Sequence, residues 1–223
     1  MSLIPDYQSF IGQTAGDEGA ATPSVVKSPG YLVAKRIFDL TFTTVVLLPA
    51  TVVVALVLLI LNPFFNPGSL IYVQKRMGRD CKPFRAFKFR TMELRKRGNR
   101  GPDDPIEADR ITPLGCWLRR SRFDELPQII NVYRGDMSLI GPRPDYFRHA
   151  HHYIREIPAY RYRHIVRPGI SGLAQIEHGY AEGTNATRIK THADIDYIQR
   201  ATFLLDLWIF WRTVVTVFRM RGA

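Results

Sequence analysis

The segment LTFTTVVLLPATVVVALVLLIL, residues 40–61, decides the architecture open to this chain. As a helix it would extend roughly 33 Å, enough to cross a hydrocarbon core of about 30 Å. Pro49 lies near its middle, where a proline removes a backbone hydrogen bond and kinks a helix. The segment therefore predicts a membrane-embedded helix that breaks at Pro49.

Basic residues flank the apolar segment on both sides: Lys35 and Arg36 before it, and Lys75 and Arg76 after it. By length alone a single-pass anchor is as good an interpretation. Basic flanks prefer the cytoplasmic face, however, and one crossing cannot keep both flanks there. We therefore favour a re-entrant helix-hairpin over residues 31–66 that returns to the same leaflet. The backbone freed at the break needs a local partner, such as Thr43 or Thr44.

Composition sets the remaining organisation. The chain has 223 residues, which suits one domain plus a membrane piece. Residues 1–30 are rich in small and polar residues and predict a flexible tail, which leaves residues 67–223 for the main domain. The net charge of +11 suits nucleic acid, anionic lipid or phosphorylated substrates. The two cysteines form no motif and predict no disulfide framework.

The predicted fold class is α+β, mainly helical, with a small β-hairpin and amphipathic helices at the membrane interface. Residues 70–76 and 84–90 form the expected hairpin around a turn at residues 78–80. Alternation places Lys88 and Arg90 on one face of the second strand, where both could reach one anion. A solvated strand face is the other interpretation of this pair. Residues 203–218 predict either an interfacial or a core helix.

The stretch FDELPQIINVYRGDMSLIGPRP, residues 123–144, carries the chemistry. Asp124 and Glu125 precede Pro127, and proline is tolerated in the first turn of a helix, where an acidic residue is a common N-cap. Capping is therefore one interpretation of Asp124. The other is catalysis, because an ionised carboxylate can attack phosphorus and form an acyl phosphate. Adjacent carboxylates with oxygen ligands favour Mg²⁺, which would shield a diphosphate from that attack.

Arg143 lies between Pro142 and Pro144, so its backbone is held extended. Its guanidinium is presented with little entropy to lose, and bidentate phosphate binding is the natural use of such a group.

Six motifs occur in order along the chain: KRIFDL (35–40), KFRTM (88–92), ITPLG (111–115), DELPQ (124–128), NVYRGDMSLIGPRP (131–144) and RPGISGLAQ (167–175). Over residues 31–223 the chain resembles the bacterial sugar transferase family, the small monotopic polyprenyl-phosphate phosphoglycosyl transferases. The block 124–144 is the most specific part of this resemblance. One departure is Leu48, where members often carry serine before the membrane proline.

The resemblance implies a function and a location. Such proteins lie on the cytoplasmic face of the bacterial inner membrane and transfer a sugar-1-phosphate from a UDP-sugar to undecaprenyl phosphate. They release UMP and use Mg²⁺, in the first membrane step of exopolysaccharide or glycoconjugate synthesis. The partners implied are the UDP-sugar, undecaprenyl phosphate and membrane lipids, with no nucleic acid.

By the same resemblance Asp124 is the nucleophile, and Glu125 is its partner in metal binding or in acting on the acceptor phosphate. Lys88, Arg90 and Arg143 hold substrate phosphates. A different class of function remains open from the residues alone: a membrane-anchored basic module that binds anionic lipid or nucleic acid without catalysis. The two adjacent carboxylates discriminate against it, because they would weaken a purely electrostatic binder.

Overall fold

The computed structural model describes residues 27–94, 101–104, 107–179 and 183–219. Most of the predicted tail therefore lies outside the described residues. The α-helices are α2 (Pro29–Phe42), α3 (Leu48–Phe65), α4 (Pro113–Ser121), α5 (Ile129–Arg134), α6 (Phe147–Glu156), α7 (Leu173–His178), α8 (Thr184–Arg200) and α9 (Phe203–Phe218). The strands are β1 (Ile71–Met77), β2 (Pro83–Phe89), β3 (Ser138–Ile140) and β4 (Gly169–Ser171). The mainly helical α+β class is thus confirmed.

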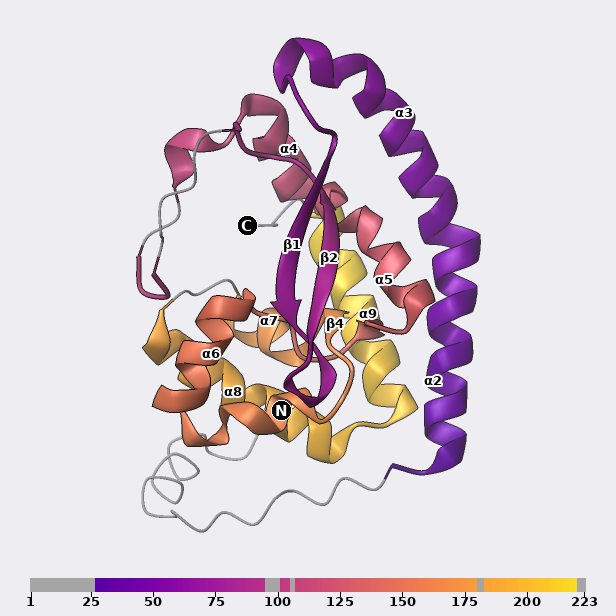
Figure 1. Ribbon diagram of the computed structural model, residues 1–223. Helices are drawn as coiled ribbons and strands as arrows, with labels where there is room; N and C mark the ends of the chain where they lie inside the picture. Colours follow the sequence, from indigo (N-terminus) through magenta and orange to yellow (C-terminus); the bar gives the residue numbers. More distant parts are fainter. Residues whose placement is uncertain (1–26, 95–100, 105–106, 180–182, 220–223) are drawn as a thin grey trace.

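Helices α2 and α3 form one long apolar run along the side of the molecule (Figure 1). A π-helical segment, Thr43–Leu47, joins them directly before Pro49, and the backbone N–H of Leu48 donates to the carbonyl of Thr43. The irregularity falls where the sequence predicts the break, although the chain stays helical through it. The hydroxyl of Thr44, expected to satisfy the backbone there, lies 2.9 Å from that of Tyr133 instead.

The outer face of this run is apolar and open. Ile60 is 69% exposed and Val53 is 61% exposed, and the run is long and apolar enough to cross a membrane by length and composition. Its inner face packs against the rest of the chain: Leu58 joins Phe89 and Leu118 in one apolar cluster. The helix is therefore one-sided, with protein on one face and exposed apolar side chains on the other.

The base of α2 is attached by polar contacts. Lys35 Nζ lies 2.8 Å from Asp206 Oδ2 of α9, and Arg36 donates to the carbonyl of Val132 in α5 at 2.8 Å. Asp39 is buried and accepts from the hydroxyl of Ser138 at 2.7 Å. The far end, at Asn62, donates to the carbonyl of Gly68 at 2.8 Å. Both ends of the long run are therefore fixed to the same body of the protein.

Strands β1 and β2 form the predicted antiparallel hairpin, with the turn at Arg79–Cys81. The hairpin crosses the middle of the molecule, with α9 behind it and α6, α7 and α8 to one side (Figure 1). A second, parallel pair joins β3 to β4. Gly141 follows β3 at a close approach, because a Cβ there would lie 2.7 Å from the carbonyl oxygen of Arg167. This packing fixes where the Pro142–Pro144 segment leaves the core.

Candidate active site

Asp124 and Glu125 lie in a 3₁₀ helix, Phe123–Gln128, between α4 and α5. Arg122 ends α4 in the left-handed conformation, with φ of 63°, and this reverses the chain so that the next turn faces β2. Arg122, rather than Asp124, occupies the N-cap position, and no side-chain capping bond is found for this helix among the described residues. The capping interpretation of Asp124 is therefore wrong. Both carboxylates are buried, Asp124 at 8% exposure and Glu125 at 6%.

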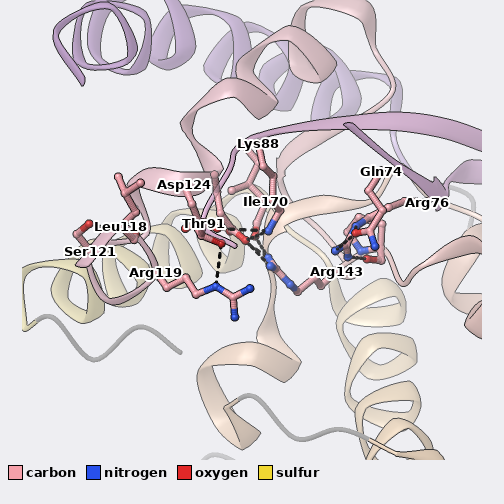
Figure 2. A network of polar contacts seen from close by, with 12 residues as sticks. Gln74, Arg76, Lys88, Thr91, Leu118, Arg119, Ser121, Asp124, Arg143 and Ile170 are labelled. Atoms are coloured by element: carbon pink, nitrogen blue, oxygen red, sulfur yellow. Dashed lines mark hydrogen bonds and ion pairs between the residues drawn. The ribbon is translucent and has the colours of Figure 1, made fainter. Parts of the chain in front are cut away.

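Lys88 and Arg143 converge on this carboxylate pair (Figure 2). Lys88 Nζ, from β2, lies 2.5 Å from Glu125 Oε1 and 3.7 Å from Asp124 Oδ2. Arg143 binds Glu125 in a bidentate manner, with Nη1 3.1 Å from Oε2 and Nη2 on Oε1. The structure thus brings together four of the five predicted polar site residues, from segments up to 55 positions apart along the chain (143 − 88). We call these four residues the dyad cluster.

The two carboxylates differ in their electrostatic environment. Burial raises the pKa of Asp124, and Lys88 offsets part of that increase. Burial alone would also raise the pKa of Glu125, but Arg143 and Lys88 hold it well below its ordinary value. Glu125 is therefore an ionised anchor for two cations. Asp124 is the carboxylate with fewer charge partners at hydrogen-bonding distance, which suits an attacking group.

Further hydrogen bonds fix the position of Arg143 and of the backbone next to it. Its Nη1 donates to the carbonyl of Ile170 at 3.2 Å, and its own carbonyl accepts from Arg163 at 2.9 Å. Arg76 donates to the carbonyl of Pro144. These contacts add to the proline restriction seen in the sequence, so the guanidinium is aimed before any ligand arrives.

Arg90 lies elsewhere. It follows β2, and its guanidinium binds the loop after α3: Nε donates to the carbonyl of Ser69 at 2.6 Å, and Nη1 donates to Asn66 Oδ1 at 2.8 Å. A further bond from Nη1 reaches the carbonyl of Met92 at 3.1 Å. Only 5% of Arg90 is exposed. The expectation that Lys88 and Arg90 reach one anion together is not met, because the strand ends between them and their side chains bind different partners.

Two further arginines, Arg119 and Arg122 at the end of α4, lie near the dyad cluster, where their charges act on its carboxylates. Arg119 Nε donates to the hydroxyl of Thr91 at 3.0 Å, with the guanidinium beside Asp124 (Figure 2). Arg163 was missed, because no local pattern separates it from the other basic residues around it.

Asp124 and Glu125, the carboxylates expected to hold Mg²⁺, lie together in the dyad cluster. Within the residues that the structure describes, no group of three or more His, Cys, Asp or Glu side chains could hold a metal ion. Mg²⁺ is commonly held by one or two carboxylates together with substrate phosphates and water. The residues present fit that arrangement, in which the substrate supplies the remaining oxygen ligands.

Comparison with known proteins identifies the family. The family described as "Bacterial sugar transferase" matches residues 30–220. The chain belongs to this family. A relative from Aeromonas hydrophila, named UDP-N-acetylgalactosamine-undecaprenyl-phosphate N-acetylgalactosaminephosphotransferase, is 41% identical over 201 residues, covering 90% of this chain and 47% of the relative.

Two further bacterial sugar transferase relatives extend the comparison. A UDP-glucose:undecaprenyl-phosphate glucose-1-phosphate transferase from Caulobacter vibrioides is 41% identical over 160 residues, covering 71% of this chain and 60% of its own. The exopolysaccharide production protein PSS from Rhizobium leguminosarum is 34% identical over 195 residues, covering 83% of this chain and 95% of its own. The chain spans about half the length of the first two relatives. Their names describe two different sugars.

Proposed function

We propose that this protein transfers a sugar-1-phosphate from a UDP-sugar to undecaprenyl phosphate and releases UMP. The observation that carries the proposal is the dyad cluster, in which two buried carboxylates meet Lys88 and a pre-aimed Arg143. A cation pair that already binds a carboxylate can bind phosphate oxygens in the same way. The named relatives act on undecaprenyl phosphate, and the exposed apolar helix provides a surface for a lipid acceptor.

In the first step a carboxylate oxygen of Asp124 attacks the β-phosphorus of the UDP-sugar. The bond between that phosphorus and the oxygen bridging to the α-phosphate breaks, and UMP leaves with the electron pair. The product is a phospho-aspartate that carries the sugar. Lys88 and Arg143 stabilise the charge that develops on the phosphate oxygens. Mg²⁺, held by Asp124 and Glu125, would supply further charge neutralisation there.

In the second step a phosphate oxygen of undecaprenyl phosphate attacks the phosphorus of the phospho-aspartate. The acyl-phosphate bond breaks, Asp124 regains its carboxylate, and the sugar leaves on a polyprenyl diphosphate. Glu125 stays ionised because its pKa is held low, so it keeps Lys88 and Arg143 in place while UMP leaves and undecaprenyl phosphate enters. The acceptor phosphate then meets the same two cations that held the donor.

We further propose that the long helical run enters the inner membrane from the cytoplasmic face and does not cross it. Support comes from its two ends: Arg36 binds α5 near the dyad, and Asn62 binds the loop that leads to the hairpin. A single crossing would place these contacts on opposite sides of the bilayer. A re-entrant path with the irregularity at Pro49 keeps both on one side.

Acceptor-dependent UMP release tests the function. The purified protein is given Mg²⁺, undecaprenyl phosphate and a panel of UDP-sugars, with Asp124→Asn run in parallel. We expect release from at least one sugar, its loss without acceptor under multiple turnover, and its loss in the variant. Silence across the panel from folded, membrane-bound protein would support the non-catalytic binding module instead.

Cysteine labelling tests the topology. A cysteine introduced at residue 2 should react with a membrane-impermeant reagent only after the inner membrane is opened. Labelling of intact spheroplasts from the periplasmic side would overturn the re-entrant path and restore the single-pass anchor.

A further inference from the structure

A cleft adjoins the dyad cluster and shares Arg143 with it. Its lining includes Arg143, Asp145, Arg163, Gln175, Lys190 and Asp194. These residues come from the Pro142–Pro144 segment and its continuation, from the 3₁₀ helix Pro158–His164, from α7 and from α8. Arg143 also binds Glu125, so one arginine belongs both to the dyad cluster and to the cleft wall. With the donor phosphate on Arg143, the cleft is the neighbouring space for a group attached to that phosphate.

The positive charge of Arg163 is used within the wall of the cleft. Its side chain is 3% exposed, lies 2.6 Å from Asp194 Oδ2, and pairs with Asp145 Oδ2. It also donates to the carbonyl of Arg143. Two carboxylates therefore neutralise this buried guanidinium, and it has little capacity left for a ligand.

Asp145, unlike Arg163, is partly exposed to the cleft. Its side chain is 33% exposed, and Tyr160 and Arg163 both contact the same oxygen, Oδ2. Burial alone would raise the pKa of Asp145, but Arg163 and the hydroxyl of Tyr160 hold it below the ordinary value. An ionised carboxylate thus lines the cleft as a hydrogen-bond acceptor. Lys190 is another lining residue, its charge helps to lower the pKa of Asp145, and an ammonium can donate.

This pairing differs in chemistry from the dyad cluster. A carboxylate at the wall repels a phosphate, whereas hydroxyl groups can donate to it and accept from an ammonium. Tyr160 and Arg163 both contact Oδ2 of Asp145, so Oδ1, with two lone pairs, is the atom placed to accept from neighbouring hydroxyls on one ring. The cleft is therefore suited to a neutral, hydroxyl-bearing group that is attached to the phosphate held by Arg143.

We propose that this cleft binds vicinal hydroxyl groups of the donor, with Asp145 as the acceptor and Lys190 as the donor of hydrogen bonds. The inference rests on the proposed function. Both the hexose and the ribose of a UDP-sugar carry such hydroxyls, and either could be the group bound. If the hexose is bound, the cleft selects the sugar.

The test compares Asp145→Asn and Lys190→Gln with the parent protein. Steady-state kinetics are measured for UDP-sugars that differ at single ring positions, and UMP is measured as an inhibitor. We expect KM for the accepted donor to rise roughly tenfold in each variant, or about 1.4 kcal/mol, with a smaller change in kcat. Arg200→Gln is the matched control, because it removes one positive charge from the exposed end of the same helix.

The two measurements, kinetics across the sugar panel and inhibition by UMP, distinguish hexose binding from ribose binding. Hexose binding changes the ratio of kcat/KM between sugars and leaves inhibition by UMP unaltered, whereas ribose binding weakens UMP and all donors alike. If both variants keep the parental KM, sugar preference and UMP inhibition at an unchanged thermal midpoint, the inference is wrong. Lys190→Gln decides the matter if Asp145→Asn fails to fold. Failure of the proposed function would show differently, as an absence of UMP release from the parent protein itself.

Discussion

Lys88 and Arg90 are two residues apart, yet they belong to different regions of the molecule. Lys88 lies in the dyad cluster and contacts two carboxylates. Arg90 lies in what we call the exit cluster, formed by Arg90, Asn66, Ser69 and Met92, where its partners are mainly backbone carbonyls. The same alternation along the strand suggests one role for both, and the structure gives them two.

The two clusters differ in whether a ligand can replace the contacts that their cations make. Phosphate oxygens can take over the contacts that Lys88 and Arg143 make with a carboxylate, because charge and geometry are similar. The carbonyls around Arg90 carry no net charge and lie in the loop that ends α3 and in the segment after β2. Removing the guanidinium leaves the buried acceptors of Asn66 without this donor. A ligand can therefore replace contacts in the dyad cluster, whereas the contacts of the exit cluster hold the loop after α3 in place.

Asp124→Asn should have the largest effect. The amide cannot form the acyl phosphate, so UMP release should fall roughly 10⁴-fold or more, while sedimentation with membranes stays unaltered. Asp196→Asn, on the exposed face of α8, is the control. Parental turnover in Asp124→Asn would rule out the covalent mechanism.

Arg143→Ala should come next, with kcat/KM reduced about 10²- to 10³-fold through loss of phosphate stabilisation. Arg143→Lys keeps the charge but loses the bidentate geometry, so it should recover only part of that loss. The readout is initial rate against UDP-sugar concentration. Full recovery by lysine would show that charge alone is needed at this position.

Arg90→Met tests the other side of the comparison. We expect a loss of about 2–4 kcal/mol in the free energy of unfolding, because several buried acceptors lose a charged donor. Thermal unfolding in detergent measures it, and Arg85→Met on the exposed part of β2 serves as the control. Parental stability together with a KM raised tenfold would contradict the structural role and indicate that Arg90 binds substrate phosphate.

The smallest predicted effect is a shift of the pH profile in Lys88→Met, in addition to the loss of rate expected when a phosphate-binding cation is removed. Burial raises the pKa of Asp124 and Lys88 lowers it, so without this lysine the carboxylate takes up a proton at a higher pH. Attack requires the ionised form, and the acid limb of kcat/KM should therefore move to higher pH. Lys82→Met removes a charge from the exposed hairpin turn and should leave the limb in place.

Much of the fold followed from local patterns. The hairpin around residues 78–80, the helix over residues 203–218 and the irregularity before Pro49 depend on neighbours along the chain, so alternation and proline placement are sufficient to predict them. The 3₁₀ geometry at Asp124 was not predicted, because it depends on the left-handed turn at Arg122 and on packing against β2.

Local patterns alone identify the residue types of the site: an ionisable pair at 124–125, an arginine between two prolines, and an apolar run flanked by basic residues. Each of these is set by a few adjacent residues. Packing of distant segments assigns Glu125 as the anchor of both cations, places Arg90 in the exit cluster, and brings Asp145 and Lys190 to one cleft. Those assignments depend on which groups meet after burial, and a buried charge takes the partners that the packed chain brings within reach.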